Sequence, residues 1–280
     1  MRLATVRQNG GSRAARLDGE DELIFLDADD VGQLLRSPDW REIAERSDGS
    51  GVRFSEADLA PVVPRPSKII CVGLNYRSHI LEMGRELPGY PTLFAKFSAS
   101  LIGARDELLL PAESREVDWE AELGVIVGER LRRVSPEEAR RRIAGYTIVN
   151  DVSMRDWQWR TPQWLQGKTF EASTPVGPFL VTPEEVGHAE DLELRCEVDG
   201  EVVQEARTSD LVFGPADVVS YISRFITLEP GDLIATGTPG GVGAGREPKV
   251  FLSPGQILRT SIEGLGECVN RCVEETGPRS

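Results

Sequence analysis

The chain has 280 residues, of which 46 are acidic and 32 are basic, and its formal net charge is −14. This charge argues against a nucleic-acid partner, because phosphate contacts need a basic surface. No apolar run is long enough to cross a bilayer, and the N-terminus lacks the apolar segment of a signal peptide. We therefore expect a cytoplasmic, globular protein, with its four cysteines as buried free thiols.

The first part of the chain predicts a small N-terminal α+β domain over residues 1–62. Its first half has strand-like runs with glycine-rich turns, and the next twenty residues have the pattern of one or two short helices. Three prolines in residues 60–68 indicate a linker. A larger domain is then expected over residues 67–275.

The segment "CVGLNYRSHILEMG", residues 71–84, holds one of only two histidines in the chain. His79 precedes Glu82 by one helical turn, so the carboxylate can orient and charge a side chain whose pKa lies near neutrality. An ion pair on a solvated helix face is the alternative. The other histidine, His188, lies in a polar loop and is expected at the surface.

The segment "VDWEAELGVIVG", residues 117–128, predicts a strand because its second half is β-branched and ends in glycine. Side chains alternate faces in a strand, so Asp118, Glu120 and Glu122 are expected on one face. Like charges at this spacing repel unless water or a cation separates them. A solvated sheet edge and a site for Mg²⁺ or Mn²⁺ are both compatible with the pattern.

A second strand-like run, residues 145–156, offers a third carboxylate, Asp151. Arg155, Gln158 and Lys168 follow within twenty residues. An all-carboxylate set does not suit zinc, which prefers cysteine and histidine.

Further helices and turns are predicted in the larger domain. Ser135 and Thr182 each precede a Pro-Glu-Glu sequence that is typical of a helix start. Asp199–Gly200 predicts a hairpin turn, and residues 214–228 predict a helix.

The glycine-rich run at residues 231–243 predicts a turn whose exposed backbone N–H groups could hold a carboxylate, with an ordinary turn as the alternative. Because strands and helices do not alternate regularly along the chain, we expect an α+β fold.

Taken in order, seven segments resemble the fumarylacetoacetate hydrolase family. They are "GLNYRSH", "SLIG", "DWEAELGVIVG", "NDVSMRD", "GKTFEASTPVGP", "EPGDLIATGTPGGVG" and "SDLVFGPADVVSYIS". The resemblance implies that mixed sheets roll into a β-sandwich, with the small N-terminal domain that many bacterial members carry. It also implies a homodimer.

The resemblance further implies roles for nine residues. The implied metal ligands are Glu120, Glu122 and Asp151. The implied catalytic residues are His79, Glu82 and Lys168. The implied substrate contacts are Arg155, Gln158 and Thr238. The dyad of His79 and Glu82 is expected on a short lid helix.

The activity implied is metal-dependent hydrolysis of the C–C bond of a 2,4-dioxo acid of the acylpyruvate or fumarylpyruvate type, as in the breakdown of aromatic compounds. The substrate would be a small anionic keto acid. Decarboxylation of a β-keto acid such as oxaloacetate, keto–enol isomerisation and sugar-acid dehydration use the same ligands and stay open. A non-catalytic, metal-stabilised binding module is the alternative from another class.

Overall fold

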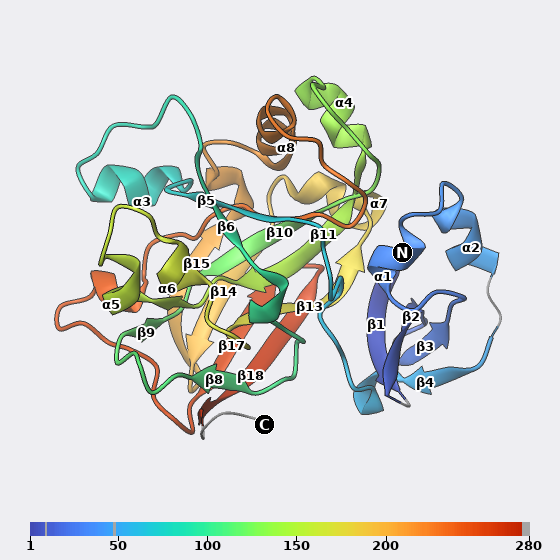
Figure 1. Cartoon of the computed structure of the whole chain (residues 1–280), viewed down its shortest axis with the longest axis horizontal. Helices are drawn as coiled ribbons and strands as arrows, with labels where there is room; N and C mark the ends of the chain where they lie inside the picture. The colour runs from blue at the N-terminus through green and yellow to red at the C-terminus, as the bar shows by residue number, and fades with distance from the viewer. Residues whose placement is uncertain (9, 47–48, 276–280) are drawn as a thin grey trace.

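The computed structural model describes residues 1–8, 10–46 and 49–275. It is an α+β protein in which two β-sheets pack against each other, with short helices around them (Figure 1). The predicted mixed, sheet-rich architecture is confirmed. In the described part of the chain, no helix is long and apolar enough to span a membrane.

The larger sheet has eleven strands among the described residues. In chain order they are β1 (Arg2–Gln8), β2 (Gly11–Asp18), β3 (Glu22–Phe25), β4 (Gly51–Arg53), β5 (Ile69–Gly73), β6 (Thr92–Lys96), β7 (Leu101–Ile102), β10 (Ala121–Val127), β11 (Ile143–Asn150), β13 (Thr174–Val181) and β16 (Leu233–Ala235). Their order across the sheet is β4-β3-β2-β1-β13-β11-β10-β16-β5-β6, with β7 joined to β13. The sheet is mixed, because β16 and β5 are parallel whereas β10 and β11 are antiparallel.

The N-terminal strands are part of this sheet, because β1 pairs with β13 through Arg2 and Leu3. The proline-rich segment is packed against them, and the Thr5 hydroxyl donates a hydrogen bond to the carbonyl of the buried Val62. A sequence pattern typical of a linker therefore forms part of a buried contact.

The second sheet has the order β15-β14-β17-β18-β8. Its strands are β8 (Leu108–Leu110), β14 (Glu193–Val198), β15 (Glu201–Arg207), β17 (Ile257–Ile262) and β18 (Gly266–Glu274). Strands β10, β11 and β13 contact β14, β17 and β18 across the sandwich. Fully buried side chains such as Leu123, Ile148, Leu194 and Leu258 fill the space between the two sheets.

Eight short α-helices lie in the described residues. They are α1 (Val31–Leu34), α2 (Trp40–Arg46), α3 (Arg77–Glu82), α4 (Pro136–Arg141), α5 (Arg155–Gln158), α6 (Leu165–Lys168), α7 (Pro183–Val186) and α8 (Pro215–Ser223). The predicted cap at Ser135 is confirmed, since its hydroxyl accepts a hydrogen bond from the Glu138 N–H. The hairpin at Asp199–Gly200 is also confirmed, because it joins β14 to β15. All four cysteines are free and buried, as predicted.

Two predicted elements differ from the structure. The helix expected over residues 214–228 ends at Ser223, and Leu228 forms a β-bridge with Leu131. The strand expected over residues 117–128 is interrupted after β9 (Val117–Asp118), which pairs with β12 (Ser153–Met154).

The interruption has a local cause. The N–H of Trp119 donates to the Asp118 carboxylate, and the N–H of Glu120 donates to the Asn150 side chain, so neither N–H bonds to the backbone of a neighbouring strand. The strand resumes as β10, which is buried on both faces rather than on one. One face packs in the sandwich core, and the other packs in a second core that includes Ile126 and helix α1.

Candidate active site

A cavity of about 540 Å³ lies between α3 on one side and α5 and α6 on the other. Eight of the nine predicted site residues line it, and they are His79, Glu82, Glu120, Glu122, Arg155, Gln158, Lys168 and Thr238. The ninth, Asp151, is fully buried next to them. The structure therefore brings together residues that are up to 159 positions apart in the chain.

The three predicted metal carboxylates converge at one point. Glu120, Glu122 and Asp151 are buried, and each offers an oxygen within 4.8 Å of the others. Antiparallel pairing of β10 with β11 produces this cluster, because Ala121 lies opposite Asn150 and the N–H of Asp151 donates to the carbonyl of Glu120. The meeting of the three side chains thus follows from strand register.

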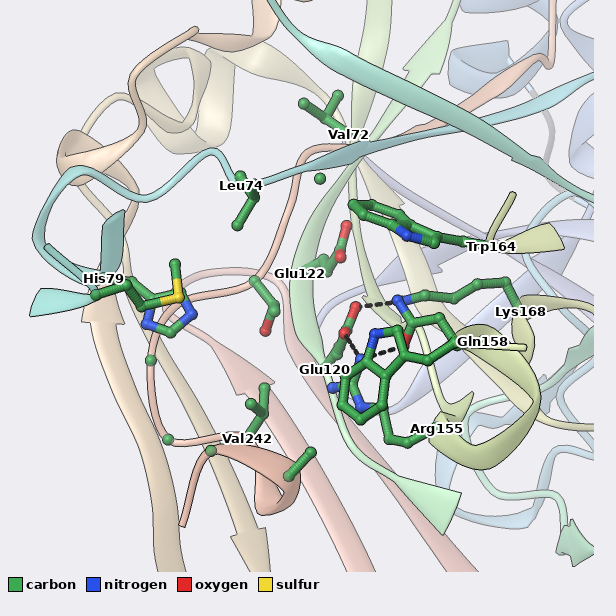
Figure 2. A pocket seen from close by; sticks show the side chains of 18 of the residues that line it. Val72, Leu74, His79, Glu120, Glu122, Arg155, Gln158, Trp164, Lys168 and Val242 are labelled. Atoms are coloured by element: carbon green, nitrogen blue, oxygen red, sulfur yellow. Dashed lines mark hydrogen bonds and ion pairs between the residues drawn. The ribbon is translucent and has the colours of Figure 1, made fainter. Parts of the chain in front are cut away.

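Buried cations surround two of these carboxylates, Glu120 and Asp151, and Figure 2 shows Lys168 and Arg155 beside Glu120. The Lys168 ammonium lies 2.6 Å from Glu120 Oε2 and 2.9 Å from Asp151 Oδ2. Arg155 Nη1 lies 2.6 Å from Glu120 Oε1, and Lys96 Nζ lies 2.6 Å from Asp151 Oδ1. Lys96 was not among the predicted site residues, although a lysine in the strand-like run "LFAKF" indicates a need for a buried partner.

Glu122 differs from its two neighbours. In the part of the chain that the structure describes, its carboxylate accepts a hydrogen bond from the Gly237 N–H at 2.7 Å but has no ion pair. Burial raises the pKa of Glu122 well above its usual value, and the carboxylates of Asp151 and Glu120 add to the shift. A divalent cation at this point would relieve both the burial cost and the repulsion.

The donor set fits a hard divalent cation. Three carboxylate oxygens suit Mg²⁺ or Mn²⁺, which prefer oxygen ligands and retain positions for water or substrate. The protein's own cations are not sufficient, because the described cluster has four buried carboxylates and only three buried cations. These are Asp118, Glu120, Glu122 and Asp151 against Lys96, Arg155 and Lys168.

Asp118 does not share the open acidic face that strand alternation predicts. Its carboxylate lies 2.8 Å from Arg155 Nε and accepts hydrogen bonds from the N–H groups of Gly243 and Ala244. The glycine-rich turn therefore does bind carboxylates, as predicted, but they belong to the protein: Glu122 at Gly237, and Asp118 further along the turn. Asp118 fixes Arg155 beside Glu120.

The ion pairs of Lys168 with Glu120 and Asp151 keep its side chain charged. Burial alone would lower the pKa of Lys168, but the carboxylates of Asp151 and Glu120 outweigh it and raise the pKa above its ordinary value. Burial would likewise raise the pKa of Asp151, but Lys168 and Lys96 lower it. Both groups therefore stay ionised, and Lys168 can stabilise negative charge in the cavity.

His79 lies on the opposite wall of the cavity from Lys168, with Glu120 and Glu122 between them (Figure 2). It is half-buried in α3. A Cβ atom on Gly240 would lie 3.2 Å from His79 Nδ1 and 3.4 Å from Glu82 Oε2, so both side chains approach the same point of the glycine-rich turn. Burial lowers the pKa of His79, although Glu82 and Glu120 oppose the shift. The imidazole of His79 is therefore uncharged at neutral pH.

The two other predicted substrate contacts are held in place by protein groups. Gln158 Oε1 accepts a hydrogen bond from Arg155 Nη1 at 2.8 Å, and the Thr238 hydroxyl accepts one from Gln204 Nε2 at 2.8 Å. Arg155 Nη2 is buried and has no hydrogen-bond partner among the described residues, so it retains a donor for an oxygen in the cavity.

Comparison with known proteins identifies the family. The model of the fumarylacetoacetate (FAA) hydrolase C-terminal domain matches residues 68–273. The chain belongs to the fumarylacetoacetate hydrolase family. A mitochondrial oxaloacetate tautomerase of Rattus norvegicus, Fahd2a, is 45% identical over 216 residues, which are 77% of this chain and 69% of that protein.

Two solved structures of the family share the fold over nearly the whole chain. The fumarylacetoacetate hydrolase of Exiguobacterium antarcticum has a TM-score of 0.87 and 32% identity, and the match covers 98% of this chain and 100% of that chain. The 5-carboxymethyl-2-hydroxymuconate delta-isomerase of Mycobacterium smegmatis has a TM-score of 0.83 and 31% identity, with the same coverage of 98% and 100%. Relatives of this chain are therefore enzymes, and their names include tautomerase, isomerase and hydrolase.

These relatives support the prediction of an enzyme of this family and leave two finer predictions open. The expectation of C–C bond hydrolysis is less well supported than its alternative, because the rat relative is named a tautomerase. The cytoplasmic location stays a prediction, since that relative is mitochondrial.

Proposed function

We propose that this protein catalyses the keto–enol tautomerisation of oxaloacetate or a closely similar 2-oxo dicarboxylate. The observation that carries the proposal is the 45% identity to an oxaloacetate tautomerase over most of both chains. A cavity with a neutral histidine on one wall and a protonated lysine on the other supports it.

Glu120, Glu122 and Asp151 would hold Mg²⁺ or Mn²⁺ in this proposal. The bound cation would supply Lewis-acid polarisation of the 2-oxo group. With the cation in place, the buried cluster carries a net positive charge, which attracts a dianionic substrate to a protein of formal charge −14.

The protein's own groups then move one proton. In the keto-to-enol direction, the neutral imidazole of His79 accepts a proton from C3, and the C2 oxygen gains negative charge. Lys168 and the free donor of Arg155 stabilise that charge by hydrogen bonds. Because Lys168 is held in its charged form by two carboxylates, we assign both transfers to His79, which returns the proton to the C2 oxygen. The reverse sequence gives the keto form.

Tautomerisation requires no water molecule and breaks no C–C bond, so one base suffices. Hydrolysis of an acylpyruvate would in addition need His79 to activate a water molecule. The 32% identity to a fumarylacetoacetate hydrolase keeps this reaction as the second candidate.

The deciding experiment compares the products. Protein stripped with chelator and restored with Mg²⁺ or Mn²⁺ is mixed with freshly dissolved enol-oxaloacetate, and the loss of enol absorbance is followed. We expect faster loss than in buffer, without release of pyruvate. A Glu122→Gln protein prepared in parallel gives the background rate.

Two results would replace the proposal. Pyruvate formed together with an acid from acetylpyruvate or fumarylpyruvate would establish hydrolysis. Pyruvate and CO₂ formed from oxaloacetate at the rate of enol loss would establish decarboxylation.

A further inference from the structure

We propose that Asp210 is a positioning residue that caps helix α3 from outside and so holds His79 in the cavity. The inference rests on the proposed function only for the role of His79. Its structural part, the ordering of α3 by Asp210, stands on contacts of the described residues.

Helix α3 is weakly anchored through its own residues. It has six residues, and among them only Ile80 is buried. The neighbouring Leu81 and Met83 are 54% and 40% exposed. Tyr76 occupies the N-cap position but provides no side-chain hydrogen bond to the helix. Helices this short are unstable without tertiary contacts, because the nucleation cost is spread over few hydrogen bonds.

Asp210 supplies the missing cap from a distant part of the sequence. Its Oδ2 accepts a hydrogen bond from the Ser78 N–H at 3.0 Å, and its Oδ1 accepts one from the Ser78 hydroxyl at 3.1 Å. The Ser78 N–H is in the first turn of α3, where backbone donors have no partner within the helix. A carboxylate at this end also interacts favourably with the helix dipole.

The segment that carries Asp210 is itself firmly held. Asp210 ends the 3₁₀-helix η4 (Thr208–Asp210). The Thr208 hydroxyl donates to the carbonyl of Ala189 and accepts from the N–H of Leu192. Asp210 therefore projects from a segment held by buried hydrogen bonds, whereas α3 buries only Ile80 among its own residues.

The chain just before α3 is fixed to the same support. The side chain of the fully buried Asn75 donates to the carbonyls of Phe213 and Thr236, and accepts from the Phe213 N–H. Asn75 thus fixes the start of the segment in the interior, whereas Asp210 acts at the exposed Ser78. Position 79 follows directly, so the order of the first turn sets the position of the imidazole.

The structural test is hydrogen exchange of the α3 amides, with matched variants. Asp210→Ala should speed exchange of peptides covering residues 77–84 by about fivefold, the effect of losing a typical helix cap. Asp210→Asn, which retains an acceptor, should restore most of the protection. Ser78→Ala should have a smaller effect in the wild-type background and none in the Asp210→Ala background, because both changes remove the same interaction.

The control is a second six-residue helix. Ser135 caps α4, so Ser135→Ala should speed exchange of α4 alone and leave catalysis unchanged. The capping role would be overturned if α3 exchanged at the wild-type rate in Asp210→Ala. It would also be overturned if the effects of Asp210→Ala and Ser78→Ala on α3 exchange were fully additive. Neither measurement requires that the protein be a tautomerase.

The functional test follows from the same variants. Asp210→Ala should lower kcat/KM by up to the factor seen in exchange, with the affinity for Mg²⁺ alone unchanged, and Asp210→Asn should recover activity. Faster exchange with an unchanged kcat/KM would show that the order of α3 does not position His79 for turnover, and would overturn that part. Absence of tautomerase activity in the wild type, with the exchange results as expected, would instead contradict the proposed function.

Discussion

The two walls of the cavity are built by different means. On one wall, Lys168 and Arg155 are 1% and 4% exposed, and each lies in ion pairs with two carboxylates. On the other, His79 is half-buried in a six-residue helix, next to the exposed Ser78. The first wall is a fixed array of charges, and the second is a lightly held helix.

The difference matches what each wall must do in the proposed reaction. Charges that stabilise a developing oxyanion act best when they are fixed before the reaction, because reorganisation then costs nothing. A base that receives and returns a proton needs access to substrate, which a helix at the cavity edge permits. Substitutions on the two walls should therefore differ in their effects on turnover and on stability.

Glu122→Gln should abolish metal binding and reduce activity by at least about 1,000-fold, since a bound metal supplies several kcal/mol of stabilisation. It removes the one carboxylate of the triad without an ion pair among the described residues, so the metal-free protein should not lose stability. Calorimetric titration with Mg²⁺ and Mn²⁺ measures the first effect, and thermal unfolding with chelator present measures the second. Retained Mg²⁺ affinity would contradict the assignment of this ligand.

Lys168→Met should reduce kcat by about 100- to 1,000-fold, as loss of an oxyanion donor does. It should also destabilise the metal-free protein by about 3–5 kcal/mol, because it leaves two buried carboxylates with less compensation. Denaturant unfolding and steady-state kinetics measure the two effects. If the Lys168→Met variant were inactive but as stable as the wild type, the ion pairs of Lys168 would not contribute to the stability of this wall.

His79→Ala should reduce kcat by about 100-fold or more, the typical contribution of general base catalysis. In contrast to Lys168→Met, it should leave Mg²⁺ affinity and unfolding free energy close to those of the wild type, because His79 lies at the cavity edge. The same assays make this comparison directly. If His79→Ala retained full activity, the base would have to be sought elsewhere.

The dependence of kcat/KM on pH should show a smaller effect, whose direction differs between two variants. Neutral His79 is the active form, so at saturating metal kcat/KM should fall about tenfold per pH unit below its pKa, which lies under the ordinary 6.5. Burial is the main cause of the low pKa; Glu82 and Glu120 raise it, whereas Arg85 and Arg155 lower it. Glu82→Gln should therefore move the acid limb to lower pH, and Arg85→Gln to higher pH. Shifts of the same sign in both variants would exclude His79 as the titrating group.

The sequence predicted the carboxylate cluster well because its basis is local. Alternation placed Glu120 and Glu122 on one face, and a strand end placed Asp151 nearby. The predicted place of Asp118 on the same open face was wrong, since its carboxylate binds the N–H groups of Gly243 and Ala244, which are more than 120 residues away. Patterns of hydrophobicity carry no information about such partners.

The supporting contacts were not predictable for the same reason. The ion pair of Lys96 with Asp151 joins β6 to the end of β11, and the cap from Asp210 joins positions 132 residues apart. The roles of His79 and Lys168 came from resemblance to the family, and their geometry came only from the structure.

The pairing of β1 with β13 has a consequence for engineering this protein. A shortened chain that begins near residue 68, where the family domain begins, would leave the backbone of β13 at Leu180 and Val181 without its partner strand. Open strand edges of this kind recruit other chains and promote aggregation. Domain exchange between relatives should therefore preserve the register of Arg2 with Val181. The first strand of the transplanted N-terminal unit then pairs with the exposed edge of β13.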